Sequence, residues 1–157
     1  MKFSCDKHLI QSAAATAARA ASAKSPIPAL EGLLIQAGAG VRLTGYDLKK
    51  GIYTTIEADV ERPGSAVLNA KLFTEMLRRL PDGIVTVEVG EQNAVKVKCG
   101  RSAYDFIAID AEEYPELPEM DESEAVSIPQ KTLKAMIDET IFAVSTNESR
   151  PVYMGSM

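Results

Sequence analysis

The side chains of this sequence best suited to nucleophilic chemistry are two cysteines and a single histidine. Cys5 and His8 lie three positions apart, and Cys99 stands directly before Gly100. A catalytic thiol needs a base and a third group that orients that base. The sequence places no obvious third group beside Cys5 and His8. We therefore expect both thiols to be buried or chemically idle; a cysteine-dependent enzyme would lose its activity on alkylation.

Metal and phosphate sites have equally little support in the sequence. With one histidine, a metal would have to be held mainly by carboxylates, and no D-x-D calcium loop occurs. The G-A-G at residues 38–40 lacks the Lys-Ser/Thr of a phosphate-binding loop. We expect no metal, no cofactor and no catalytic activity.

Acidic residues outnumber basic ones by 22 to 17, and the resulting net charge of −5 at first argues against a nucleic-acid partner. Eight of the acids, however, fall between Asp110 and Glu124, a stretch without Lys or Arg that also contains Pro115 and Pro118. Such a stretch is typical of an extended, solvated linker. The rest of the chain has 17 basic and 14 acidic residues, a net charge of +3. The composition therefore does not exclude a DNA partner.

The sequence also indicates where the protein is found. It contains no run of about 18 uncharged apolar residues, so we expect no membrane span. The N-terminus lacks a signal-peptide layout, because its Ala-rich stretch is interrupted by Arg19. Two cysteines 94 positions apart make neither a disulfide framework nor a zinc cluster. They fit a reducing compartment, and we expect a cytoplasmic protein.

The predicted strands and helices, which must position any site, occur in the same order twice: one strand, one helix and then three strands. Alternating apolar residues, Ala-rich helical stretches and Gly/Pro turns predict them. The first set is predicted at residues 1–5, 7–22 (helix), 30–36, 41–46 and 51–60, and the second at 66–68, 70–80 (helix), 84–89, 94–98 and 103–109. This order predicts an α+β domain with two helices against two antiparallel sheets, rather than a parallel βαβ fold.

A second repeat has a longer period, because the start of the chain matches its end at an offset of 123 positions. The identical pairs are Ser4 with Ser127, Ala20 with Ala143, Ser22 with Ser145, Pro28 with Pro151 and Gly32 with Gly155. We expect residues 1–118 to form a complete domain and residues 125–157 to begin a truncated second copy, with the acidic linker at 110–124. Such repetition implies a concatenated or ring-like architecture, of which this sequence is a fragment.

The predicted helices carry more basic than acidic residues. The first carries Lys7 and Arg19, with Lys24 just beyond it, and the second carries Lys71, Arg78 and Arg79 against Glu75; the third, at 130–144, carries Lys131 and Lys134 with Asp138 and Glu139. If these helices share one face, that face attracts phosphates without distinguishing base sequence. The alternative is a small α+β protein-interaction module whose basic helices are only solvated.

An ordered set of motifs resembles the bacterial DNA polymerase III beta subunit, the sliding clamp family. The set comprises M-K-F-S-C-D at 1–6, K-S-P-I-P-A-L-E-G-L-L at 24–34, L-T-G-Y-D-L at 43–48, P-G-S-A-V-L-N-A-K-L-F at 63–73, R-L-P at 79–81, C-G-R-S at 99–102, E-E-Y-P-E-L-P at 112–118 and S-T-N-E-S-R-P-V-Y-M-G at 145–155. The resemblance covers the whole chain without large gaps.

That resemblance implies a DNA clamp fold and a function. Clamps of this family are head-to-tail homodimers of three-domain chains that form a ring around duplex DNA, with helices lining the hole and sheets facing outward. They are non-catalytic processivity factors that tether the replicative polymerase, and a clamp loader places them on DNA. Contacts with DNA must then be weak and non-specific, since a contact that distinguished sequence would slow sliding.

The resemblance also implies site residues. The family's DNA contacts match Lys24, Lys71 and Asn147, and Arg78 is a looser match on the inner surface; the dimer interface matches Met76, Arg101, Tyr104 and Phe106; the client-peptide pocket matches Arg150 and Tyr153. The family often has Arg where Lys24 and Lys71 stand, so the charge is kept without the bidentate geometry. For Tyr104 and Phe106, ordinary alternating sheet packing is an equally good explanation. Some members carry aromatic residues where Pro151 and Val152 stand.

Overall fold

The computed structural model describes residues 1–118, 127–147 and 149–155. The chain divides into two compact units, Met1–Pro118 (unit 1) and Glu119–Met157 (unit 2). The acidic residues Glu119, Asp121, Glu122 and Glu124 of the predicted linker lie outside the described residues, as does Val126 of the long repeat.

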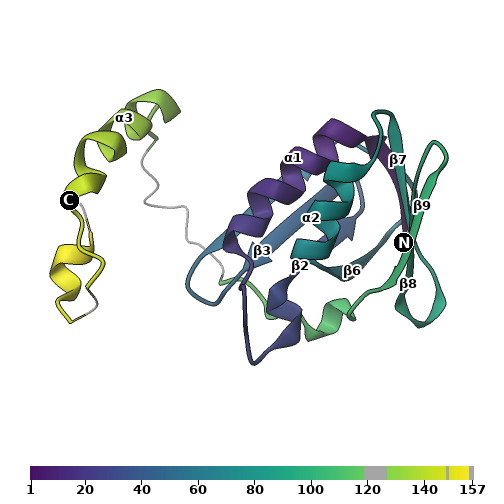
Figure 1. Ribbon diagram of the computed structural model, residues 1–157, viewed down its shortest axis with the longest axis horizontal. Coiled ribbons are helices and arrows are strands. Elements are labelled where there is room, and N and C mark those ends of the chain that lie inside the picture. Colours follow the sequence, from purple (N-terminus) through teal and green to yellow (C-terminus); the bar gives the residue numbers. More distant parts are fainter. Residues whose placement is uncertain (119–126, 148, 156–157) are drawn as a thin grey trace. The chain divides into compact units, whose positions relative to one another are not determined.

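Unit 1 contains two antiparallel sheets and two α-helices (Figure 1). One sheet has the order β5-β1-β7-β8-β9 and the other β4-β3-β2-β6. The strands are β1 (Lys2–Asp6), β2 (Gly32–Ala37), β3 (Val41–Tyr46), β4 (Gly51–Ile56), β5 (Asp59–Arg62), β6 (Gly64–Asn69), β7 (Ile84–Val89), β8 (Ala94–Cys99) and β9 (Ser102–Ile107); the helices are α1 (Lys7–Ala17) and α2 (Ala70–Arg79). This architecture is the predicted α+β class with two helices against two sheets.

The two helices start in the same way and bury equivalent residues. Asp6 accepts a hydrogen bond from the His8 amide at the start of α1, and Asn69 accepts one from the Leu72 amide at the start of α2. Each acid or amide side chain satisfies an N–H that the helix itself leaves unpaired. At an offset of 63 positions the buried residues correspond: Ile10 with Phe73, Ala13 with Met76 and Ala14 with Leu77. The helices lie side by side (Figure 1) and share one core with both sheets.

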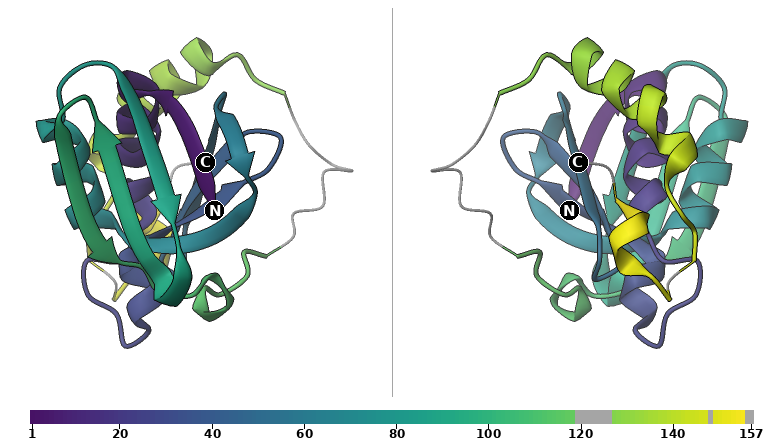
Figure 2. Two further views of the ribbon diagram at one scale, coloured as in Figure 1. Left: turned by 90° about the vertical axis from the view of Figure 1, so that its right-hand side faces the viewer. Right: turned by 90° about the vertical axis from the view of Figure 1, so that its left-hand side faces the viewer.

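The first strand of each repeat pairs with the sheet of the other repeat. β1 leads into α1 but lies antiparallel to β7, with Phe3 opposite Val87 and Cys5 opposite Val85. β6 leads into α2 but lies antiparallel to β2, with Leu33 opposite Leu68. The left view of Figure 2 shows β7, β8 and β9 in front of the helices. Because the two repeats exchange strands, they fold as one domain with one core.

A glycine allows α1 to lie directly on the β4-β3-β2-β6 sheet. A Cβ at Gly45 of β3 would stand 2.0 Å from the carbonyl oxygen of Ala17. One strand away, the Thr54 hydroxyl donates a hydrogen bond to the carbonyl oxygen of Ala13 at 3.3 Å. The Ala-rich sequence of α1 therefore serves close packing on β3 and β4 as well as helix propensity.

One predicted strand is wrong. The sequence pattern predicts a single strand at 51–60, but this run divides into β4 and β5, which belong to different sheets. β5 crosses over to pair with β1, where Phe3 faces Val60 with an irregular register beside it. Similarly, the first helix is α-helical only to Ala17 and continues as a 3₁₀ turn over Ala18–Ala20.

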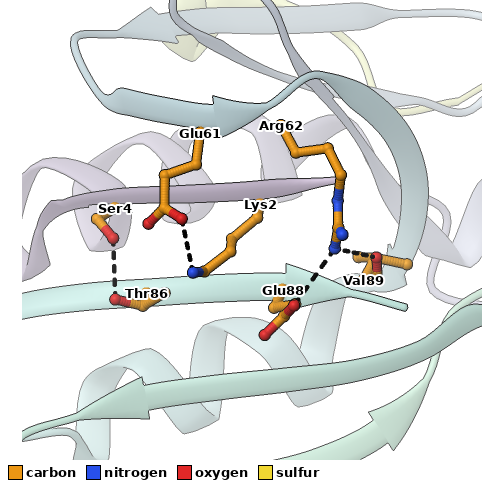
Figure 3. Close-up of polar contacts among 7 residues, drawn as sticks. All are labelled: Lys2, Ser4, Glu61, Arg62, Thr86, Glu88 and Val89. Atoms are coloured by element: carbon orange, nitrogen blue, oxygen red, sulfur yellow. Dashed lines mark hydrogen bonds and ion pairs between the residues drawn. The ribbon is translucent and has the colours of Figure 1, made fainter.

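Side chains on the outer face of the β5-β1-β7-β8-β9 sheet hold β5 in place (Figure 3). Lys2 of β1 pairs with Glu61 at 2.6 Å, and Arg62 donates to Glu88 at 3.3 Å and to the carbonyl oxygen of Val89 at 3.5 Å. The hydroxyls of Ser4 and Thr86 are hydrogen bonded at 2.9 Å. Lys2 and Arg62 of this face thus already have partners.

The end of unit 1 packs against the outer face of the other sheet. Ile109 pairs with Val67, and the hydroxyl of the buried Tyr114 donates to the carbonyl oxygen of Thr44 at 3.3 Å. Leu117 contacts β4, since a Cβ at Gly51 would stand 2.8 Å from its side chain. The expectation of a solvated segment from Asp110 onward is therefore wrong for Tyr114.

Unit 2 contains α3 (Gln130–Thr140) and 3₁₀ turns at Ile141–Ala143 and Pro151–Met154. Leu133, Met136, Ile137 and Ile141 are all about half exposed. At the offset of 123 positions, Leu133 and Ile137 correspond to Ile10 and Ala14, which α1 buries. Among the described residues, no helix is long and apolar enough to cross a membrane.

Candidate nucleic-acid interface and docking groove

Five basic residues lie on or beside the helices of unit 1 with exposed side chains; Arg79 lines the groove toward β9, and the other four are Arg19, Lys24, Lys71 and Arg78. We call these four the helix-face cations. Lys71 is the second residue of α2 and Arg78 lies in its last turn. Seven positions make almost two helical turns, so the two side chains share one side of α2, about 10 Å apart along its axis.

Lys24 stands in an ordered loop that follows the 3₁₀ turn containing Arg19. The Ser22 hydroxyl donates to the carbonyl oxygen of Lys24 at 3.0 Å, and the Ser25 amide donates to Oε1 of Glu31 at 3.0 Å. Pro28 then begins the next 3₁₀ turn, Pro28–Glu31. Local hydrogen bonds therefore present Lys24 at a defined position beyond the C-terminal end of α1.

The helix-face cations are not neutralised by acids. Within residues 1–118, 127–147 and 149–155, none of them has a carboxylate oxygen within 4.0 Å. By contrast, Lys96 on the sheet surface lies 3.8 Å from Asp105. Lys7, counted with the basic helix residues from sequence, is buried, and its Nζ lies 3.5 Å from Asp82. The helix side of unit 1 thus offers cations to an external anion, and Lys7 is not among them.

Two hollows lie along these helices. The larger, about 410 Å³, is lined by Lys71, Glu31 and mostly small residues: Ala18, Ala21, Ser22, Ala23, Asn69, Ala70 and Thr74. The smaller, about 170 Å³, is lined by Gln11, Ala15, Thr74, Glu75 and Arg78. Within the described part of the chain, Gln11 Oε1 is buried and has no hydrogen-bond partner. Small side chains leave this surface open to a bulky anion such as a DNA strand.

Asn147, the fourth predicted DNA contact, is exposed in unit 2. Its Oδ1 accepts from the Ser149 amide, and its own amide donates to the Ser145 hydroxyl, both at 3.0 Å. Arg150 and Tyr153, predicted for a client-peptide pocket, are also exposed, and the Tyr153 amide donates to the carbonyl oxygen of Arg150. Backbone hydrogen bonds thus join Arg150 to Asn147 and Tyr153 to Arg150.

An apolar groove separates α2 from the edge strand β9. It has a volume of about 150 Å³ and is lined by Leu72, Glu75, Met76, Arg79, Tyr104, Asp105 and Phe106. Three of the four predicted interface residues meet in this docking groove: Met76, Tyr104 and Phe106. The fourth, Arg101, is exposed in the turn between β8 and β9 and does not line it. Sequence reasoning missed Leu72 and Arg79, although both lie within about one helical turn of Met76.

The family model for the N-terminal domain of the DNA polymerase III beta subunit matches residues 1–118. The chain belongs to this family.

Curated beta subunits are similar over nearly the whole chain. The beta sliding clamp of Bacillus subtilis is 37% identical over 164 residues, covering 99% of this chain and 43% of that protein. The beta sliding clamp of Halalkalibacterium halodurans is 35% identical with the same coverage. The chain thus spans about two fifths of the length of these relatives.

Solved beta-subunit structures share the fold. The DNA polymerase sliding clamp from Bacillus subtilis superposes with a TM-score of 0.92 at 36% identity, covering 97% of this chain and 42% of that one. The beta subunit from Streptococcus pyogenes gives 0.90 at 34% identity, with the same coverage. The resemblance stated from sequence motifs and the predicted clamp fold are confirmed.

The nucleophile candidates contribute to packing in this beta-subunit domain. Cys5 is buried on β1, and burial raises the pKa of its thiol to about 12, so it stays protonated. Cys99 is also buried, and its thiol donates to the carbonyl oxygen of Pro81 at 3.2 Å. His8 Nε2 lies 3.2 Å from Asp82 Oδ1. Among the described residues, no cluster of His, Cys, Asp and Glu could hold a metal ion.

Proposed function

We propose that this chain is part of a sliding clamp, a non-catalytic processivity factor that encircles duplex DNA and tethers the replicative polymerase. The observation that carries the proposal is the set of helix-face cations, which have no ion partner among the described residues in a chain of the beta-subunit family. Lys24, Lys71 and Arg78, with Arg19 beside them, contact the phosphates of duplex DNA, and Asn147 contacts DNA from its loop. Such contacts are independent of base sequence, as sliding requires.

The docking groove receives another clamp domain in a head-to-tail homodimer. Its Leu72, Met76, Tyr104 and Phe106 offer apolar surface, and the exposed Arg101 adds charge beside it. Apolar residues at the centre with charges at the edge are typical of protein interfaces. A heterologous contact of this kind gives a ring when its rotation closes after a whole number of subunits.

Unit 2 begins a second clamp domain, in which Arg150 and Tyr153 contribute to a pocket for client peptides. The correspondence of α3 with α1, and the apolar face that α3 exposes among the described residues, support this assignment. The partners of the assembled clamp are then the replicative polymerase and a clamp loader, and it acts in the cytoplasm.

Mapping the DNA-binding face tests the proposal. We expect a 20-base-pair duplex, added at low ionic strength to the ¹⁵N-labelled chain, to shift the amide signals of α1, α2 and the loop around Lys24. Signals of β1, β5 and β7, whose outer-face cations Lys2 and Arg62 are already paired, should stay in place. Shifts confined to the sheet side, or no shift at any salt concentration, would contradict the proposal.

A further inference from the structure

Each of the two hollows beside Lys71 and Arg78 contains one cation and one carboxylate. In the larger hollow these are Lys71 and Glu31, and in the smaller they are Arg78 and Glu75. Neither cation lies within 4.0 Å of a carboxylate oxygen in the described chain, so neither hollow contains an ion pair. Both acids therefore add negative potential to the space beside the cations.

Both carboxylates are half-buried, and that of Glu31 is hydrogen bonded. Glu31 is half-buried at the end of the Pro28–Glu31 turn, and its Oε1 accepts from the Ser25 amide at 3.0 Å. That bond fixes the side chain toward the hollow but leaves a full negative charge. Glu75 is half-buried on α2 and lines both the smaller hollow and the docking groove.

We propose that Glu31 and Glu75 limit the affinity of the helix face for DNA by repelling phosphates from the two hollows. This inference rests on the proposed DNA-binding function and concerns the same face. A hollow with a cation and small walls would otherwise hold a phosphate in one position, and a moving clamp would stop there. With a carboxylate in each hollow, phosphates meet the cations from outside and leave easily.

The expected effect is modest and depends on salt. Unit charges about 8 Å apart, in the high dielectric of a protein surface, change affinity by about two- to threefold. At about 20 mM salt the Debye length exceeds that separation, whereas at about 0.5 M it is shorter. Removing one carboxylate should therefore raise DNA affinity about two- to threefold at low salt and leave it unchanged at high salt.

The experiment compares Glu31→Gln and Glu75→Gln with Glu57→Gln in the 157-residue chain. The Glu31→Gln side chain keeps an oxygen that can accept from the Ser25 amide, so the loop should persist; thermal unfolding verifies it. Glu57 is exposed between β4 and β5 and has no ion pair in the described residues, which makes Glu57→Gln the matched charge control. Binding is measured by fluorescence anisotropy of a labelled 20-base-pair duplex.

The inference is supported if Glu31→Gln and Glu75→Gln each bind about two- to threefold more tightly at low salt while Glu57→Gln matches the parent. It is overturned, with the DNA-binding function intact, if the double variant Lys24→Gln, Lys71→Gln weakens binding but neither Glu variant strengthens it. If the lysine variant binds like the parent, the proposed function fails and this inference fails with it. Equal strengthening by all three Glu variants also overturns it, because net charge alone then explains the gain.

Discussion

Replacing Lys24 and Lys71 by Gln should halve the salt dependence of DNA binding. Both side chains are accessible and without an ion partner in the described residues, so no salt bridge compensates for their loss. If each helix-face cation neutralises one phosphate, log K falls against log salt with a slope of about −3.6 for four contacts and about −1.8 for two. Between about 50 and 200 mM salt, the parent chain then loses about 150-fold in affinity and the double variant only about 12-fold.

The assay is a titration of labelled duplex over a series of salt concentrations, with Lys98→Gln as the control. Lys98 is an exposed lysine on β8, opposite Ala103, with no carboxylate within 4.0 Å in the described chain. Its removal changes net charge by the same amount per residue but leaves the helix face intact. The reasoning is refuted if the double variant keeps the parent slope, or if Lys98→Gln lowers the slope as much per lysine.

Three further predictions concern stability. Gly45→Ala should lower the free energy of unfolding of unit 1 by about 2 kcal/mol or more, measured in urea, because its Cβ would stand 2.0 Å from the Ala17 carbonyl oxygen. The control, Gly38→Ala, should leave stability unchanged, since its Cβ would meet no atom within 4 Å in the described residues. Asn69→Ala removes the N-cap of α2 and should cost about 1 kcal/mol, whereas Asn69→Asp should cost little. Stability should fall from about pH 9 toward pH 12, because the unfolded chain loses the Cys5 proton near its ordinary pKa of 9.0 while the folded state holds it to about 12. Cys5→Ala should lessen that fall, most clearly between about pH 9 and 10, below the range in which Tyr114, whose pKa burial also raises to about 12, contributes; an unchanged pH profile would contradict the assignment.

The sequence predicts most elements because their signals are local. Alternating apolar residues bounded by Gly or Pro give the strands β2, β3 and β7, and the structure places them within about two residues of the expected bounds. No such signal marks the break between β4 and β5. The chain passes from one sheet to the other at residues 57–58, which are Glu and Ala rather than Gly or Pro. That crossing is decided by the pairing of β5 with β1, which is a tertiary interaction.

The candidate site is predictable only in part for the same reason. Lys24 and Lys71 are assigned by resemblance, and the assignment remains a prediction. The hollow beside Lys71 forms only because α2 packs against the turn after α1, and the sequence does not show this packing. Likewise, Tyr104 and Phe106 alternate as ordinary strand residues do, and only the position of β9 relative to α2 makes them walls of a groove. The sequence does not predict Leu72 as a residue of the groove, because nothing in a single sequence distinguishes a leucine that an α-helix exposes.

The internal repeat explains why the docking groove occurs at one end of unit 1. The end formed by α1 and β4 is equivalent to the end formed by α2 and β9, but α1 has Ala13 where α2 has Met76. The small side chain lets α1 approach β4 until Thr54 hydrogen bonds to the Ala13 carbonyl. At the other end, the larger Met76 is one of the residues that line a cavity of about 150 Å³ between α2 and β9. The two ends of unit 1 therefore offer different surfaces, and the proposed head-to-tail contact, which joins the groove to a surface other than itself, is heterologous.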